Sequence, residues 1–305
     1  MEIGIALPHF GQHASREMIT RVAQEAEQMG FGSVWVLERM LRPTHPIPQF
    51  GRLALMDEPY AISYDPLETL TFVAAKTERI KLGTSVLDAL FHAPVTLARR
   101  LATLDQLSGG RVIAGLGQGS VQDEFTAANV PIKRRGSGLE EIIAAMRAVW
   151  GPDPVSFSGR FYTIPESQIG PKPVQPGGPP IVIGGIAPAA IERAARIADG
   201  LNPVGVSFEM LEKSINAFRN AAQATGRDPD ALMIVVRLNG RAMGSDRPIL
   251  TGTIQEMAQD ISRLRSLRVQ HAFLDLNYAS TPMDGFLKWM EQVQAALRTS
   301  PVENL

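Results

Sequence analysis

The chain has 305 residues, of which 45% are hydrophobic and 20% charged, and its formal net charge is −1. This balance gives no electrostatic reason to expect a nucleic acid or a membrane surface as partner. The absence of cysteine excludes disulfides, thiolate nucleophiles and cysteine-bound metals. No window approaches the roughly 18 apolar residues of a membrane span. The first predicted strand begins at Glu2, which leaves no room for a signal peptide, so we expect a cytoplasmic location.

Short apolar runs alternate with stretches of helical periodicity along the whole chain. Eight runs are predicted as strands, at residues 2–7, 33–37, 80–84, 112–115, 181–183, 200–204, 232–238 and 272–276. The helical stretches space their apolar residues at i, i+3 and i+4, as Ile19, Val22 and Ala23 do. Eight strands that alternate with helices predict an α/β fold, a TIM-like (β/α)8 barrel, rather than an open sheet. We expect residues 1–305 to form it as one domain.

Two segments carry a specific signal for a helix start. Ser137-Gly-Leu-Glu140 and Thr253-Ile-Gln-Glu256 have the spacing of a capping box. In that motif the first and fourth side chains satisfy each other's backbone N–H groups. Each segment therefore predicts a helix that begins at that point.

Two connections are too long to be plain loops. One runs from Glu38 to Tyr64 after the second strand. The other is an insertion at about 120–180 after the fourth strand, with a small hairpin predicted around Ser158-Gly159. Both follow the carboxyl ends of strands, where barrel active sites lie. Long ordered loops in that position usually cover a pocket, the alternative being surface decoration.

Several predicted strands end in glycine. Gly83 ends the third strand, Gly115 follows 32 residues later in the fourth, and Gly184 ends the fifth. A spacing of about 30 residues is that of a strand–helix unit. Because glycine lacks a Cβ, these ends predict backbone that comes close to a flat or phosphorylated ligand. The run Gly115-Leu-Gly-Gln-Gly119 does not have the spacing of a dinucleotide-binding fingerprint.

The order and spacing of several segments resemble the luciferase-like monooxygenase superfamily, and most closely its branch of F420-dependent oxidoreductases. The resemblance covers residues 1–205 best. The segments that carry it are residues 26–36, 77–86, 102–111, 115–119, 171–173, 180–185 and 198–200. It implies a barrel that binds the deazaflavin coenzyme F420, or alternatively flavin mononucleotide (FMN), at the strand ends.

The resemblance also implies where the cofactor binds. A bulge after the third strand, often with a non-prolyl cis peptide, backs the ring in such proteins, and Ser85-Val86 matches it. The remaining cofactor-binding positions that it implies are Gly117, Gln118, Gly119, Ile183, Gly184, Gly185 and Ile186. A strand, two glycines and a helix that opens at Pro188 would offer free N–H groups and a positive dipole end to a phosphate. The alternative is that the glycines only form a tight turn.

Three residues are candidates for the reaction itself. His9 follows the first strand and is a candidate to position a substrate at the barrel mouth, the alternative being a merely solvated side chain. Glu38-Arg39 stands where many relatives have an acidic residue followed by histidine. Arg39 could meet an anionic group but cannot donate a proton near neutral pH. Ser120 matches a glutamate of sugar-phosphate-oxidising relatives, which argues against that activity.

Several other polar residues receive a non-catalytic interpretation. The five histidines form no metal-binding pattern, so we predict no metal site. Asp105 and Arg111 flank a Ser-Gly-Gly turn and are predicted to pair with each other. Asn202 is a weak candidate for the pocket.

The resemblance implies hydride transfer between F420 and an unidentified small organic substrate. One alternative is an FMN-dependent monooxygenase that takes reduced flavin from a partner reductase. Another is a barrel that binds the cofactor without turnover. Relatives are often dimers, so a homodimer is expected. In either enzyme the ring does the chemistry, while the protein supplies orientation and a dry pocket.

Overall fold

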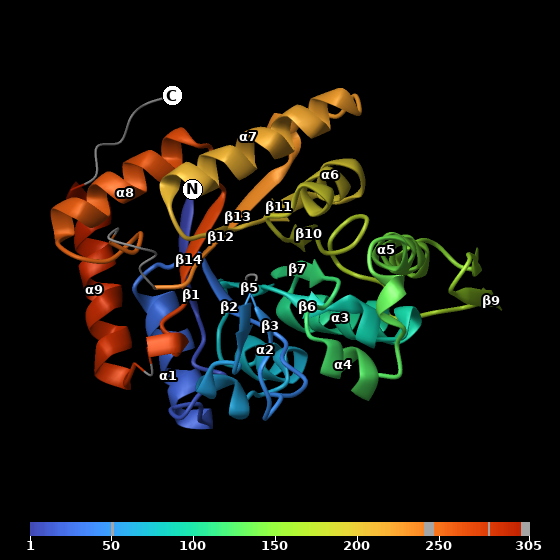
Figure 1. Ribbon diagram of the computed structural model, residues 1–305, viewed down its shortest axis with the longest axis horizontal. Helices are drawn as coiled ribbons and strands as arrows, with labels where there is room; N and C mark the ends of the chain where they lie inside the picture. Colours follow the sequence, from blue (N-terminus) through green and yellow to red (C-terminus); the bar gives the residue numbers. More distant parts are fainter. Residues whose placement is uncertain (50–51, 241–246, 280, 300–305) are drawn as a thin grey trace.

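Eight parallel strands form a closed barrel with helices around it (Figure 1). This computed structural model describes residues 1–49, 52–240, 247–279 and 281–299. The barrel strands are β1 (Glu2–Ala6), β2 (Ser33–Val36), β5 (Lys81–Thr84), β7 (Val112–Gly117), β10 (Ile181–Gly184), β11 (Gly200–Asn202), β13 (Met233–Leu238) and β14 (His271–Leu274). The sheet closes because β10 pairs in parallel with both β7 and β11. The predicted barrel is therefore confirmed.

Two short strands extend the barrel wall at its carboxyl end. β6 (Leu87–Asp88) pairs with the end of β7, and β12 (Val204–Gly205) pairs with the end of β13. The predicted strand at 200–204 is thus divided between β11 and β12, while β6 was not predicted. Both additions lie where a site is expected, and β6 brings Asp88 beside Gly117.

The helices lie on the outside of the barrel. They are α1 (Arg16–Gln28), α2 (Pro66–Ala74), α3 (Pro94–Ser108), α4 (Gln122–Ala127), α5 (Ser137–Trp150), α6 (Pro188–Ile197), α7 (Phe208–Ala224), α8 (Ile254–Ser266) and α9 (Met283–Thr299). Their buried faces and the outward residues of the strands form one continuous apolar layer. Within the described ranges, no helix combines the length and the apolar character needed to cross a membrane.

A second apolar cluster fills the inside of the barrel. Its members are Ala6, Trp35, Ile113, Val182, Val235 and Phe273. Trp35 stacks on Phe273 with ring centroids 4.7 Å apart and planes inclined by 9°. Such close packing leaves no channel through a barrel of this size. A ligand can therefore be bound only at an end of the barrel.

One of the two predicted capping boxes is wrong. Thr253 and Glu256 do bond to each other's backbone N–H groups, as expected. Ser137 instead is the first residue of α5, and the cap is Gly136 with a φ of 77°. Glu140 is engaged elsewhere, because its carboxylate binds Arg193 and Arg196 of α6. Tertiary ion pairs have replaced the local motif.

Asp105 and Arg111 are both structural, but the predicted pair between them is wrong. Asp105 accepts hydrogen bonds from the backbone N–H groups of Val174 and Gln175, at 2.8 and 3.0 Å. Arg111 donates to the carbonyl oxygens of Ala74, Thr77, Ile80 and Ser108. Asp105 therefore fastens the proline-rich end of the insertion, and Arg111 fastens the loop before β5.

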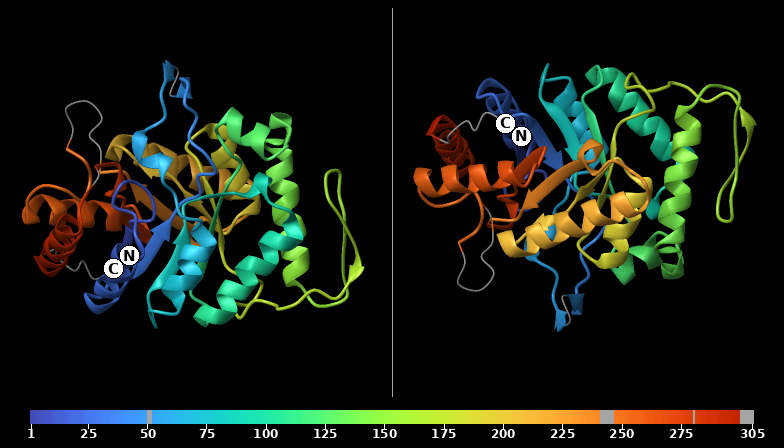
Figure 2. Two further views of the ribbon diagram at one scale, coloured as in Figure 1. Left: turned by 90° about the horizontal axis from the view of Figure 1, so that it is seen from below. Right: turned by 90° about the horizontal axis from the view of Figure 1, so that it is seen from above.

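Both long connections contain secondary structure. The segment after β2 forms a hairpin of β3 (Ile47–Gln49) and β4 (Arg52–Ala54), followed by the 3-10 helix η1 (Glu58–Ala61). The insertion between β7 and β10 contains α4, η3 (Ile132–Arg134), α5 and a hairpin of β8 (Val155–Ser158) and β9 (Thr163–Ser167). The hairpin predicted around Ser158-Gly159 is thus confirmed. It stands out from the barrel (Figure 2), which leaves α4 and η3 as the parts near the strand ends.

Candidate active site at the carboxyl ends of the barrel strands

A cavity of about 150 Å³ lies at the carboxyl ends of the strands. Its lining is Leu37, Glu38, Arg39, Tyr60, Ser85, Val86, Asp88, Gly184, Gly185, Asn202, Val204 and Arg237. We call it the inner cavity. An outer cavity of about 320 Å³ shares Arg39 and Tyr60 with it and is also lined by Ile47, Pro48, Gln49, Met56, Asp57, Ser120, Val121, Asn239 and Tyr278. The connection after β2 thus contributes to both cavities.

A larger and more open hollow of about 730 Å³ lies outside the barrel, between α2 and α3. Its charged residues, Glu68, Arg99 and Arg100, are on the surface, and Arg100 is already bonded to Glu68 at 2.6 Å. The inner cavity instead gathers buried charged groups from several strand ends. That concentration is the mark of a functional site, so volume does not decide the assignment.

The bulge after β5 forms one wall of the inner cavity. The Ser85–Val86 peptide bond is cis, as the resemblance implied. Ser85 Oγ donates to Asn202 Oδ1 at 2.6 Å, and Asn202 Nδ2 donates to the carbonyl of Val235. Arg237 Nη1 donates to the carbonyl of Ser85 at 3.0 Å. Side chains from β11 and β13 therefore fix the bulge from across the barrel, and Asn202 does line the cavity.

The strand-end glycines make room for protein atoms. A Cβ at Gly184 would lie 2.7 Å from Val86 Cγ1, and one at Gly117 would lie 2.6 Å from Val86 Cγ2. Similarly, Trp35 fills the space beside Gly83, and the Thr84 carbonyl fills that beside Gly115. Gly117 and Gly184 thus admit the side chain of Val86, which lines the cavity together with Gly184. Close approach of these glycines to a ligand stays a prediction.

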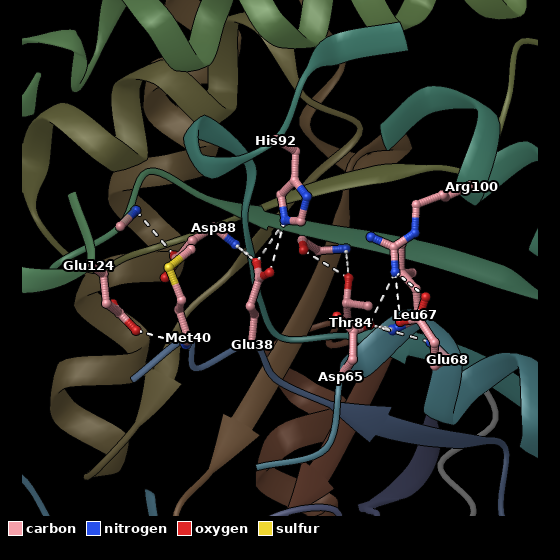
Figure 3. A network of polar contacts seen from close by, with 12 residues as sticks. Glu38, Met40, Asp65, Leu67, Glu68, Thr84, Asp88, His92, Arg100 and Glu124 are labelled. Carbon is pink, nitrogen blue, oxygen red and sulfur yellow. Dashed lines mark hydrogen bonds and ion pairs between the residues drawn. The ribbon is translucent and has the colours of Figure 1, made fainter. Parts of the chain in front are cut away.

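Glu38 joins the end of β2 to β6. Its carboxylate accepts a hydrogen bond from the Asp88 backbone N–H at 2.7 Å, and His92 Nε2 lies 2.8 Å from its Oε1. Figure 3 shows Glu38 between these two partners. The Glu38 side chain is 10% exposed. Its carboxylate therefore orders the wall of the cavity, and the catalytic role expected for it stays a prediction.

Arg39 lies on the wall between the two cavities. Its Nη1 donates to Glu124 Oε2 at 2.6 Å, and its guanidinium carbon lies 5.1 Å from the centre of the Tyr60 ring. Glu124, fully buried on α4, also accepts from the Met40 N–H. Burial raises the pKa of Glu124, and the charge of Arg39 opposes that rise. Arg39 Nε is buried without a hydrogen-bond partner among the described residues.

Asp88 is a site residue that the sequence did not indicate. It is 6% exposed, and its Oδ1 accepts a hydrogen bond from the Gly119 N–H at 3.1 Å. Burial raises the pKa of Asp88 from 3.8 to about 7. The charges of Glu124 and Glu38 also raise it, whereas Arg39 and the Gly119 N–H lower it. Asp88 is thus a carboxyl group that can hold or release a proton near neutral pH.

Arg237 is a second site residue that the sequence did not indicate. It comes from β13, where its Nη2 donates to Asp275 Oδ2 at 2.7 Å and to Tyr278 Oη at 2.9 Å. Tyr278 is in turn hydrogen-bonded to Tyr60. Arg237 Nε is buried without a partner in the described part of the chain. A charged side chain within the apolar run Met233–Leu238 was a signal that could have revealed it.

His9 lies beneath the inner cavity. Its side chain is completely buried, with Nδ1 2.8 Å from the carbonyl of Leu7. Its Nε2 accepts from the Leu37 N–H at 2.9 Å. Burial lowers the pKa of His9, so the ring is neutral near pH 7. This ring ties β1 to the end of β2, and the substrate contact expected for it stays a prediction.

The other predicted cofactor positions differ in how they face the site. Gly185 lines the inner cavity, whereas Ile183 is 1% exposed and packs into the apolar layer. Ile186 is 41% exposed. Gln118 Oε1 accepts from the Gly136 N–H at 2.9 Å, which fixes the start of α5. Gly119 contributes the N–H that Asp88 accepts. Contact of these residues with a cofactor stays a prediction.

These residues fit a flat, polar ring with an anionic extension. Arg39 and Arg237 line the inner cavity, and the Nε of each is a buried donor without a partner among the described residues. Nearby, α6 begins after Ala187, which provides no side-chain cap for the first N–H groups. An uncapped helix start suits a phosphate. No group of three or more candidate metal ligands exists in the described residues. The arrangement therefore defines an α/β barrel with a polar ligand-binding site at the carboxyl ends of its strands.

Comparison with known proteins identifies the family. The sequence profile of the luciferase-like monooxygenase family matches residues 1–240. The chain belongs to this family. It is 36% identical over 209 residues to an uncharacterised protein of Mycobacterium tuberculosis, covering 68% of this chain and 74% of that one. It is 32% identical over 219 residues to an F420-dependent glucose-6-phosphate dehydrogenase of Amycolatopsis mediterranei, covering 70% of this chain and 61% of the relative.

Solved structures share the fold across nearly the whole chain. The monooxygenase RslO1 from Streptomyces bottropensis superposes with a TM-score of 0.78 at 22% identity, covering 98% of this chain and 99% of that one. An F420-dependent secondary alcohol dehydrogenase superposes with a TM-score of 0.74 at 20% identity, covering 96% and 98%. At these identities the similarity concerns the fold.

Proposed function

We propose that this protein transfers a hydride between coenzyme F420 and a small organic substrate. The observation that carries the proposal is the inner cavity, where the Ser85–Val86 bulge adjoins Asp88, a carboxyl group with a pKa near neutrality. The chain has no cysteine nucleophile, and its described residues contain no group of three or more side chains that could bind a metal ion. A bound redox cofactor would supply the electron transfer, and the protein would supply orientation and proton exchange.

F420 is preferred to FMN because of the relatives. The glucose-6-phosphate dehydrogenases of Amycolatopsis mediterranei and Kineococcus radiotolerans, both named F420-dependent, are 32% and 30% identical to the chain. We do not extend the sugar-phosphate substrate to this chain, because Arg39 and Ser120 replace the residues expected for it. The substrate would enter through the outer cavity, where Met56 and Val121 provide apolar contacts.

The FMN-dependent monooxygenase is the second candidate, favoured by the luciferase-like family itself. It would take reduced flavin from a partner reductase. The third candidate is a barrel that binds the cofactor without turnover. The expected homodimer and cytoplasmic location stay predictions.

Equilibrium binding distinguishes the cofactors. Purified protein is titrated with F420 and with FMN, and the change in cofactor fluorescence gives each dissociation constant. We expect F420 to bind at least about tenfold more tightly, a difference of about 1.4 kcal/mol. Tight FMN binding without F420 binding would favour the monooxygenase.

Turnover is then tested with reduced F420 and a panel of aldehydes, ketones and imines, and with oxidised F420 and the matching alcohols and amines. The readout is the absorbance of the oxidised deazaflavin. Oxidation of the reduced cofactor that depends on the acceptor supports the enzyme. F420 binding without turnover of any compound supports the non-catalytic barrel.

A further inference from the structure

We propose that Asp88 is the catalytic residue that exchanges the substrate's proton while the hydride moves. The inference rests on the proposed function and deepens it. Arg39, at the position where relatives carry histidine, cannot give up its proton near neutral pH. Ser120 stands where some sugar-phosphate-oxidising relatives have a glutamate. A proton-transfer group must therefore come from elsewhere in the chain.

The position of Asp88 suits this role. It follows the Ser85–Val86 bulge by two residues and lines the inner cavity. Its backbone is fixed on one side by the ladder to Gly117 and on the other by Glu38, which accepts from its N–H. Its Oδ1 accepts from the Gly119 N–H. Within the described residues no donor bonds to Oδ2, so this oxygen is available to a molecule in the cavity.

Burial opposes ionisation of Asp88, and two neighbouring carboxylates add to this effect. Glu38 approaches from the end of β2 and Glu124 from α4, and both act as anions. Arg39 opposes them, but its Nη1 is already bonded to Glu124 at 2.6 Å. Arg135, beyond η3, is the second nearby cation and interacts with Asp88 electrostatically. His92 faces Glu38 rather than Asp88. Arg237 also lines the cavity, but it is bonded to Asp275. Burial of Asp88, together with the charges of Glu124 and Glu38, favours a proton on its carboxyl group.

The reaction balances with this one group. In oxidation, ionised Oδ2 takes the proton of a substrate hydroxyl as the adjacent carbon loses its hydrogen with the bonding electron pair to the oxidised cofactor. A carbonyl compound results, and Asp88 is left protonated. In reduction, the protonated carboxyl gives its proton to the carbonyl oxygen as the carbon gains the hydride. The proposed substrate class is an alcohol and carbonyl pair, for which a single carboxyl group suffices.

The first test needs no cofactor. Protein labelled with ¹³C at aspartate carboxyl carbons is titrated by NMR, and Asp88→Asn identifies the signal. Asparagine keeps an oxygen that accepts from Gly119 but cannot ionise. We expect one aspartate signal with a midpoint near pH 7 that is absent in the variant. Asp123→Asn, a half-buried acid on α4, is the control and should leave that signal unchanged. A signal that ionises below about pH 5 would overturn the proposal.

The second test adds the cofactor found to bind, F420 or FMN. Its binding should shift the Asp88 signal, because the ring would border the same cavity, and leave the Asp123 signal in place. The Asp88→Asn variant should still bind the cofactor. Its kcat should be about a hundredfold lower and should no longer change with pH around neutrality. A signal insensitive to bound cofactor, or a variant with wild-type turnover, contradicts the role. Absence of binding by both cofactors would instead refute the proposed function, while the first test still decides the ionisation of Asp88.

Discussion

The side chain of Val86 occupies the space that a β-carbon at Gly184 would need, since Cγ1 lies only 2.7 Å from that position. The bulge and the strand end are thus packed against each other. Glycine at 184 thus makes room for Val86, and both residues line the inner cavity.

This packing predicts the effect of Gly184→Ala. The added methyl group should displace Val86, with an overpacking cost of about 1–3 kcal/mol in stability. Cofactor binding should weaken about tenfold or more. Val86→Ala in the same chain should restore part of the affinity, because the two changes compensate in volume. The double-mutant cycle is measured by fluorescence titration with F420 and by thermal unfolding. Strictly additive effects would show that the two residues do not press on each other.

Glu38→Gln tests the electrostatic environment of Asp88. The charge of Glu38 contributes to the raised pKa of Asp88, so its removal should move the Asp88 midpoint below about 7. Glutamine still offers an oxygen to the Asp88 N–H, whereas Glu38→Ala leaves that buried donor without an acceptor. The alanine variant should lose a further 1–3 kcal/mol, roughly, of unfolding free energy. NMR titration and urea unfolding measure the two effects. An unchanged midpoint in Glu38→Gln would refute the coupling.

Asp88 also predicts how stability depends on pH. Between pH 3.8 and about 7 the folded protein retains a proton on Asp88 that the unfolded chain has lost. This contribution to the unfolding free energy therefore falls as pH rises through that window and is constant above it. Asp88→Asn lacks this contribution. Relative to the wild type, the unfolding free energy of the variant should therefore rise by up to about 4 kcal/mol as pH increases from 3.8 to about 7. Urea unfolding at mildly acidic and mildly alkaline pH provides the measurement, and parallel curves for the two proteins would contradict it.

His271, at the other end of the barrel, predicts the opposite dependence of stability on pH. Burial lowers the pKa of His271 to about 4, although Glu2 opposes this shift. Between pH 6.5 and about 4 the unfolded chain holds a proton that the folded protein lacks, so stability falls as pH is lowered. His271→Gln should therefore lose stability less steeply on acidification than the wild type. His45→Gln, whose side chain is 62% exposed, is the control and should follow the wild type.

The barrel could be predicted because each unit carries its own local signal. Apolar runs such as Val112–Gly117 and helices with a regular buried face are determined by nearby residues. The resemblance located the Ser85–Val86 bulge. The Ser137 capping box failed because its glutamate binds arginines more than 50 residues away on α6, and no local pattern reveals such a partner.

The site was only partly predictable for the same reason. Glu38 and Arg39 stand at a strand end, which marks them in the sequence. Asp88 lies in an otherwise apolar run, and its raised pKa depends on burial and on Glu38 and Glu124, which approach from separate elements. Its register beside Gly117 depends on β6, which is only two residues long. Sequence periodicity cannot detect so short a strand.

Arg39 and Tyr60 line both cavities and so form a partition between the inner cavity and the outer one. Tyr60 belongs to η1, in a connection outside the barrel sheet. Changes in this connection can therefore alter which molecules reach the inner cavity while the eight strands and their packed interior stay intact. The barrel strands hold the inner cavity, and the partition is the part of the lining that can change without them.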